Sequence, residues 1–187
     1  ITAALRLARP DSKNILIVGA GTVGQSLFDA YSAAFPKANF LVWNRTHERA
    51  LYMVKNKSNA VAVENLEAGV KRADIITCAT MSKQPIIKGE WLIPGQHLDL
   101  IGAYRPDMRE VDDLALCRST KFVDSYDTTL DHIGELKIPL KNNVISRADI
   151  LADFYGLSNF IRKSNDEITF FKNGGFSRGI RFSPLVK

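Results

Sequence analysis

Runs of consecutive apolar residues recur along this chain, separated by segments in which apolar and polar residues mix. The clearest run is Ile-Leu-Ile-Val at 15–18, introduced by Asn14. A run without apolar–polar alternation is typical of a strand buried on both faces of a parallel sheet. Such runs predict strands at residues 14–18, 40–43, 60–63, 74–77, 97–102, 121–124 and 167–172.

The segments between these strands carry helix signals. A helix opened by residues 19–24 is expected to end at Phe35, because Pro36 follows, and Thr46 can cap a helix that runs to about Lys55. The other helices expected from the sequence are 2–8, 66–71, 108–117, 127–134 and 145–155.

Strands that alternate with helices at this spacing predict parallel βαβ units with right-handed crossovers. We therefore expect an α/β protein of the Rossmann type, with a doubly wound, mostly parallel sheet and helices on both faces. Residues 1–172 are predicted to form this dinucleotide-binding domain. Residues 173–187 are rich in glycine and serine and lack clear periodicity, so we expect an irregular, weakly ordered C-terminal tail.

The residues that directly follow the strands are candidates for a ligand site, because ligands of open parallel sheets bind at the carboxyl ends of the strands. The first such segment, 19–24, reads Gly-Ala-Gly-Thr-Val-Gly between a strand and a helix. Gly19 permits the tight turn, Gly21 lets the backbone approach a pyrophosphate, and Gly24 lets helix and strand pack closely. The helix N-terminus directs N–H groups towards the phosphates. A glycine turn without a ligand is the alternative.

The end of the second strand indicates which dinucleotide is bound. Domains that bind NAD usually carry Asp or Glu there to accept hydrogen bonds from the adenosine ribose, but this chain reads Asn44, Arg45, Thr46. Arg45 offers a guanidinium to a 2′-phosphate, and Asn44 and Thr46 add neutral donors. The sequence therefore favours NADP(H), with NAD(H) beside an exposed arginine as the alternative.

Composition narrows the other classes of function. With 187 residues, 45% hydrophobic and 24% charged, the chain is of ordinary globular composition. It has neither an apolar run of 18 residues nor a recognisable signal peptide, so we expect no membrane contact and a cytoplasmic location. The net charge of +5 comes largely from the carboxyl-terminal region, without basic blocks that interleave with aromatics, so we expect no nucleic-acid partner.

Cysteine and histidine positions give no sign of a metal site. Cys78 and Cys117 lie far apart and are interpreted as small core residues. The three histidines are isolated from other ligand-type side chains, so no bound metal is expected.

Several segments, in order, resemble the ornithine cyclodeaminase/μ-crystallin family. Residues 15–24 and 44–46 are similar to its dinucleotide-binding segment, and 167–174 to its lysine-containing strand near the carboxyl end. Residues 73–80, 84–87 and above all 95–112 are more specific. Within the family, the form of residues 102–112 resembles the branch of Δ1-pyrroline-2-carboxylate and related ketimine reductases.

The resemblance implies a set of roles. The cofactor-binding residues would be Gly19, Gly21, Thr22, Val23, Gly24, Asn44, Arg45, Thr46, Ala79, Thr80, Met81, Gly102 and Ala103. Thr80 and Met81 would lie beside the nicotinamide ribose, and Gly102 and Ala103 under the ring. Asp107, Arg109 and Glu110 would hold the loop and the start of the next helix. Lys172 would approach the cofactor as a candidate catalytic residue beside Tyr104, with an exposed lysine as the alternative.

Tyr104 stands where the cyclodeaminases of this family carry a general acid/base aspartate. A phenol does not replace a carboxylate that exchanges protons near neutral pH, which argues against ornithine cyclisation. Reduction of a cyclic imine needs only hydride delivery to carbon and one proton for nitrogen, which Tyr104 could donate. A packing role for Tyr104 is the alternative.

Family members also carry an amino-terminal region that provides most substrate-binding basic residues and the dimer interface, and nothing in this sequence resembles it. We expect a cyclic imino acid substrate and a homodimer, with the cofactor half in this chain. Two other readings remain open: a crystallin-like protein that binds NADP(H) without turnover, and an ornithine cyclodeaminase-type enzyme. A shikimate-dehydrogenase-like module would share residues 44–46 but not 101–106.

Overall fold

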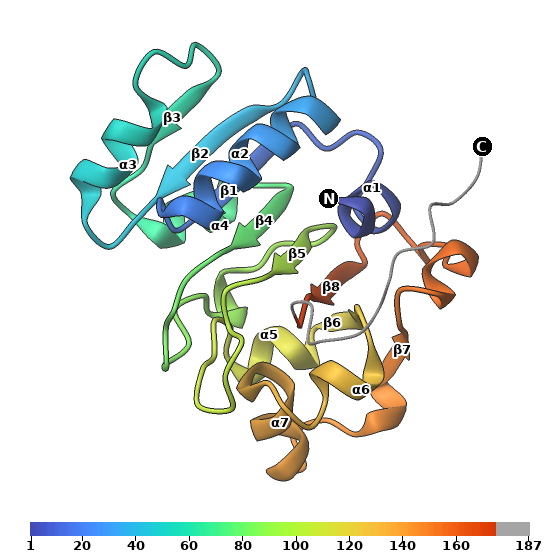
Figure 1. Ribbon diagram of the computed structural model, residues 1–187. Coiled ribbons are helices and arrows are strands. Elements are labelled where there is room, and N and C mark those ends of the chain that lie inside the picture. Colours follow the sequence, from blue (N-terminus) through green and yellow to red (C-terminus); the bar gives the residue numbers. More distant parts are fainter. Residues whose placement is uncertain (175–187) are drawn as a thin grey trace.

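One parallel sheet forms the centre of the structure, a computed structural model that describes residues 1–174 (Figure 1). Its eight strands are ordered β3-β2-β1-β4-β5-β8-β6-β7, and all their pairings are parallel. The strands are β1 (Asn14–Val18), β2 (Asn39–Trp43), β3 (Ala60–Ala62), β4 (Ile75–Cys78), β5 (His97–Leu100), β6 (Ser119–Val123), β7 (Ile150–Ala152) and β8 (Ile168–Lys172).

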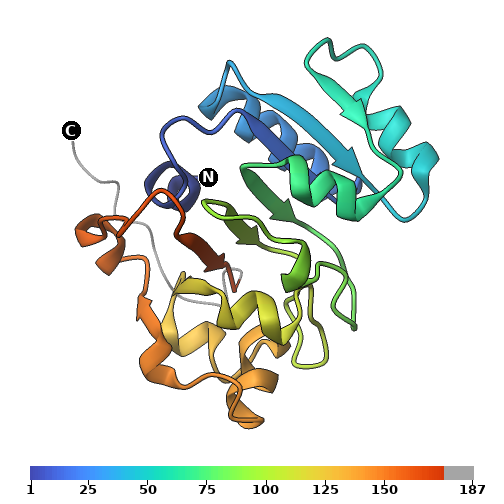
Figure 2. The ribbon, with the colours of Figure 1, turned by 180° about the vertical axis from the view of Figure 1, so that it is seen from behind.

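Helices cover both faces of this sheet. The helices are α1 (Thr2–Leu7), α2 (Thr22–Ala34), α3 (His47–Val54), α4 (Leu66–Arg72), α5 (Asp113–Cys117), α6 (Tyr126–Thr129) and α7 (Gly134–Lys141), with short 3-10 turns η1 (Gly89–Trp91), η2 (Arg147–Asp149) and η3 (Gly156–Asn159). Figure 1 shows α2 in front of the sheet. Figure 2, the view from the opposite side, shows α4 covering the other face. The predicted doubly wound α/β architecture is confirmed.

Alternation along each strand divides the core between the two faces. Ile15 and Ile17 belong to one buried apolar cluster together with residues of α2 and α3, whereas Leu16 belongs to a second cluster that includes Val70 of α4 and Leu116 of α5. Both sets are fully or almost fully buried, which explains why the strands are apolar at successive positions rather than at every second one.

The last strand lies inside the sheet rather than at its edge. β8 inserts between β5 and β6, so that Lys172 is paired with Leu100 on one side and with Val123 on the other. All five of its residues are buried. The carboxyl end of β8 therefore lies at the same end of the parallel strands as the loops after β4 and β5.

Three expectations from the sequence were wrong in this part of the chain. The helix expected at 145–155 is the turn η2 followed by the edge strand β7, because Ser146 and Asp149 form a capping box around a single turn. The helix expected from 108 begins only at Asp113, since Asp112 accepts a hydrogen bond from the Ala115 amide. The segment expected as helix 127–134 contains only the short α6, and α7, which accommodates Pro139, was not expected.

The expectations for the two cysteines and for the C-terminal tail have different outcomes. Cys78 is buried, as expected, but Cys117 at the end of α5 is exposed, so its interpretation as a core residue was wrong. The C-terminal tail was predicted for residues 173–187, and residues 175–187 of it lie outside the described part of the chain.

Candidate functional site

The glycine-rich turn after β1 lies at the point where the strand order reverses. Strands β2 and β4 flank β1 on opposite sides, and in such sheets this is the position at which ligands bind. Gly19 has a φ of 110°, a conformation that L residues with a side chain rarely adopt, and its N–H donates to the Trp43 carbonyl at 2.8 Å. A Cβ at Gly24 would lie 1.9 Å from the Gly19 carbonyl oxygen, so this glycine permits the close approach of α2.

Gly21 has a different environment from its two neighbouring glycines. It precedes α2 with an extended backbone, and a Cβ built on it meets nothing within 4 Å in the described residues. Thr22 and Val23 form the first turn of α2, and within residues 1–174 no side chain caps that helix. The open space beside Gly21 and the N–H groups of this first turn are suited to an incoming anionic group.

The loop after β2 is linked to this turn by Asn44. Its Oδ1 accepts a hydrogen bond from the Ala20 amide at 3.0 Å, and its Nδ2 donates to the Thr46 carbonyl at 2.9 Å. Arg45 and Thr46 are exposed beyond it, and Arg45 makes no ion pair with any residue of 1–174. Asn44 thus fixes the position of the loop, and Arg45 is the cation presented at its rim.

The loops after β4 and β5 meet at a single buried carboxylate. Glu110 accepts hydrogen bonds at Oε1 from the Thr80 amide (2.8 Å) and hydroxyl (2.9 Å). At Oε2 it accepts from the amides of Gly102 (2.9 Å) and Ala103 (3.2 Å). A Cβ at Gly102 would lie 2.1 Å from the Thr80 carbonyl oxygen, so the loops are in close contact.

A second carboxylate supports the first. Glu135 of α7 is fully buried and accepts hydrogen bonds from the amides of Glu110 (2.7 Å) and Val111 (3.1 Å). Burial, together with the nearby charge of Glu110, raises the pKa of Glu135 to about 7. Glu135 had no predicted role, since no local sequence pattern shows that its side chain accepts a hydrogen bond from an amide 25 residues earlier in the chain.

Lys172 is fully buried, so the alternative of an exposed lysine was wrong. Its Nζ donates to the carbonyls of Leu100 (3.1 Å) and Asn173 (2.8 Å). Burial lowers the pKa of Lys172, and the charges of Glu110 and Glu135 oppose that effect. In the described structure Lys172 therefore connects β8 to β5 underneath the site.

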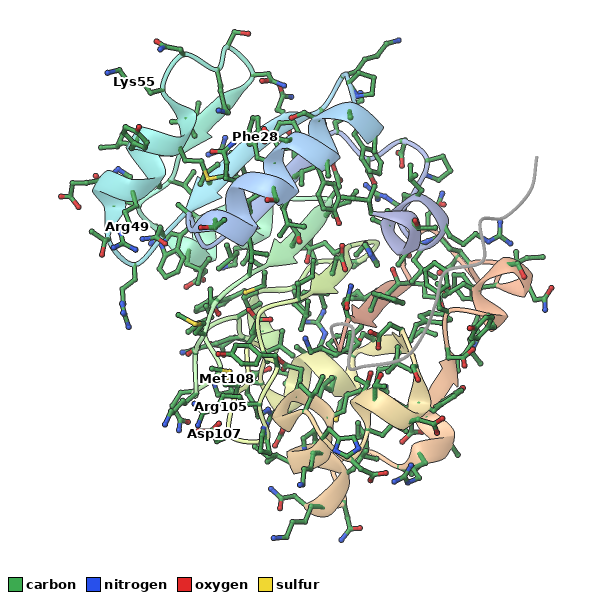
Figure 3. All side chains as sticks on the ribbon, in the orientation of Figure 1. Phe28, Arg49, Lys55, Arg105, Asp107 and Met108 are labelled. Atoms are coloured by element: carbon green, nitrogen blue, oxygen red, sulfur yellow. The ribbon has the colours of Figure 1, made fainter. Side chains whose placement is uncertain are left out.

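The remaining predicted residues lie at the exposed edge of these loops. Ala79 follows β4, and its carbonyl oxygen lies against Gly19, 2.8 Å from where a Cβ would stand. Met81 and Tyr104 are largely exposed, at 73% and 57% of their surface, so Tyr104 is not part of the buried core of residues 1–174. Figure 3 shows Arg105, Asp107 and Met108 together in the loop beyond the carboxyl end of β5.

Ion pairs and hydrogen bonds fix this loop, in agreement with the structural roles expected for Asp107, Arg109 and Glu110. Asp107 pairs with both Lys83 (3.1 Å) and Arg105 (3.0 Å), and its hydrogen bond with Lys83 lowers the pKa of the carboxyl. The Arg109 amide donates to the Ser82 carbonyl at 3.1 Å. The exposed edge of the loop carries two cations and one carboxylate.

Residues 1–174 contain neither a metal-type cluster of side chains nor a helix that could cross a membrane. No group of three or more His, Cys, Asp or Glu side chains in this part of the chain is arranged to hold a metal ion. None of its helices has both the length and the apolar character needed to span a bilayer.

Comparison with known proteins gives related sequences and folds. Residues 2–178 match the model of the ornithine cyclodeaminase/mu-crystallin family. The chain is 46% identical over 183 residues to Δ1-pyrroline-2-carboxylate reductase of Paracoccus denitrificans, covering 94% of this chain and 58% of that protein. It is 31% identical to the ketimine reductase mu-crystallin of Mus musculus, over 93% of this chain and 54% of that protein.

A solved structure is also similar. The Δ1-pyrroline-2-carboxylate reductase of Thermococcus litoralis, in complex with NADH and L-proline, superposes with a TM-score of 0.86 at 29% identity. The match covers 92% of this chain and 56% of that one. The chain thus spans little more than half the length of the relatives it matches.

Proposed function

Because the chain belongs to the ornithine cyclodeaminase/mu-crystallin family, we propose that it is the NADP(H)-binding part of a reductase of cyclic imines, of the Δ1-pyrroline-2-carboxylate or ketimine type. The observation that carries the proposal is the pairing of the glycine turn after β1 with the Thr80 loop after β4, at the switch point of a parallel sheet. The similarity to two reductases of these substrates supports the substrate class.

The preference for NADP(H) rests on the end of β2. No carboxylate stands at 44–46, and the Arg45 guanidinium is exposed and unpaired within residues 1–174. A 2′-phosphate placed there would meet a cation rather than a like charge. The relative from Thermococcus litoralis was solved with NADH, so NAD(H) is the competing cofactor and the test must compare both.

The residues of this chain would bind and orient the cofactor. Its nicotinamide, when bound, supplies the hydride. Gly21 and the first turn of α2 would hold the pyrophosphate, and Thr80 with Gly102 and Ala103 would position the nicotinamide half.

Tyr104 is the proposed proton donor to the imine nitrogen. It lies in the loop after β5, directly after Gly102 and Ala103, and 57% of its surface is exposed. Lys172 is assigned a supporting role instead, since its Nζ is buried and donates to two backbone carbonyls. A phenol at position 104 suits a single proton donation better than the repeated proton exchange of cyclodeamination.

The first experiment is a parallel titration of the purified chain with NADPH and NADH, read by nicotinamide fluorescence. Tighter binding of NADPH is the expected result, and binding of neither would overturn the proposal. Δ1-pyrroline-2-carboxylate with NADPH is then assayed for cofactor oxidation, with and without a supplied amino-terminal region. Binding of NADPH without turnover, even when that region is supplied, would favour a crystallin-like binding role. The cytoplasmic location and the homodimer stay predictions.

A further inference from the structure

We propose that Glu110 is a positioning residue that sets the spacing of the two loops between which the nicotinamide half of the cofactor lies. The inference rests on the proposed cofactor site and deepens it. Glu110 lies outside the glycine-rich motif and is completely buried, so it touches neither solvent nor any ligand on the surface.

The geometry of the carboxylate carries the inference. Its two oxygens are divided between the two loops: Oε1 takes both donors of Thr80, and Oε2 takes the amides of Gly102 and Ala103. Four hydrogen bonds to one carboxyl group fix both loops relative to a single side chain. If the carboxylate is lost, the loop after β4 and the loop after β5 lose their common acceptor.

Glu110 is itself held in place from below. The amides of Glu110 and Val111 donate to the Glu135 carboxylate, which fixes the backbone from which the Glu110 side chain projects. Gly102 completes the arrangement, because any side chain there would collide with Thr80 and with Glu110 Oε1, 2.4 Å from the Cβ position. The loops are therefore closely packed on a buried polar group rather than on an apolar core.

Within residues 1–174, Glu110 makes no side-chain hydrogen bond to the residues of the adenosine half of the site. Gly19 and Gly21 lie after β1, and Asn44 connects their turn to the loop after β2 through hydrogen bonds of its own. Loss of the Glu110 carboxylate should thus affect the two halves of the cofactor unequally. This asymmetry separates positioning of the nicotinamide from a general loss of folding.

The test compares Glu110→Gln with wild type for two ligands, NADPH and 2′-phospho-ADP-ribose, which lacks the nicotinamide. Glutamine keeps the shape but places an NH2 group against backbone donors. We expect NADPH binding to weaken about tenfold to a hundredfold and the bound nicotinamide fluorescence to change. Binding of 2′-phospho-ADP-ribose should stay within about twofold of wild type.

Asp74→Asn is the matched control. Asp74 precedes β4 at the opposite end of the strand from Thr80 and also accepts backbone amides, those of Lys13 (2.8 Å) and Asn14 (2.9 Å). It should lose thermal stability without changing the ratio of the two affinities. If Glu110→Gln does not fold, Glu110→Asp replaces it, because a carboxylate shortened by one methylene group cannot reach the donors of both loops.

The outcomes distinguish the two proposals. Equal weakening of both ligands, or unchanged NADPH binding, in a folded Glu110→Gln or Glu110→Asp protein overturns the positioning role and leaves the cofactor site standing. Wild-type protein that binds neither ligand overturns the cofactor site and the positioning role together.

Discussion

Arg45 is the residue on which the choice of cofactor depends. It follows β2, where the adenosine ribose is expected, and its side chain is exposed. Its position is defined by Asn44, which holds the loop through two hydrogen bonds to backbone groups. A flexible cation on a fixed loop can pair with a phosphate without a large rearrangement of the backbone.

Replacing Arg45 by alanine should therefore separate the two cofactors. Arg45→Ala is expected to weaken NADPH binding by about 1.5–3 kcal/mol, the scale of a hydrogen bond to a charged group, and to leave NADH nearly unchanged. Isothermal titration with each cofactor measures both values. Arg72→Ala, which removes an equal charge from the end of α4 near the amino ends of the strands, is the control. Equal losses for NADPH and NADH would contradict the role of Arg45.

At the scale of elements, the glycines of the β1–turn–α2 unit are required for different reasons. Gly24 is required by packing, since a Cβ there would overlap the Gly19 carbonyl, whereas the surroundings of Gly21 would accept a Cβ. The extended backbone at Gly21 is also one that alanine adopts readily. A glycine that the fold does not need is explained by the approach of a ligand.

Alanine substitutions at these two glycines should give opposite results. Gly21→Ala is expected to change the free energy of unfolding by about 0.5 kcal/mol or less while weakening NADPH binding at least about tenfold. Gly24→Ala should lower the free energy of unfolding by about 1–3 kcal/mol because the turn must open. Urea unfolding and NADPH titration of both variants measure these effects. If Gly21→Ala binds NADPH with wild-type affinity, the pyrophosphate does not bind beside Gly21.

The sequence predicted elements well where the signal is local. Within residues 1–174 the apolar runs identified every strand except β7, and the glycine-rich motif at 19–24 identified the turn, because both depend on neighbouring residues. The prediction of a helix at 145–155 was wrong because a short apolar run does not distinguish a helix from an edge strand. The roles of Glu135 and Lys172 depend on α7 and β8 reaching the same place, which only the tertiary fold determines.

At the scale of the whole molecule, two buried groups link stability to pH in opposite directions. His97 in β5 is fully buried, with Nδ1 beside the Thr169 hydroxyl at 2.9 Å, and burial lowers its pKa from 6.5 to about 3. Glu135 is fully buried as well, and burial raises its pKa from 4.5 to about 7. Each group is neutral in the folded protein over a range of pH in which it is charged in the unfolded chain.

For His97, the folded protein binds fewer protons than the unfolded chain between about pH 3 and pH 6.5. Its contribution to stability is therefore complete above pH 6.5 and is lost as the pH falls towards 3. His97→Asn, which keeps a partner for Thr169 but does not titrate there, should lose less stability on acidification than wild type. Urea unfolding across this range measures the difference, and parallel curves for the two proteins would refute it.

Glu135 acts in the opposite sense, because the folded protein binds more protons than the unfolded chain between pH 4.5 and about 7. Stability from this group is complete below pH 4.5 and is lost as the pH rises towards 7, by roughly 3 kcal/mol in total. Glu135→Gln cannot ionise, so its unfolding free energy should fall less over this interval, even if it is lower at every pH. If wild type and Glu135→Gln change in parallel from about pH 5 to pH 8, Glu135 is ionised throughout. In that case Lys172 and the amides of Glu110 and Val111 stabilise its charge more strongly than burial opposes it.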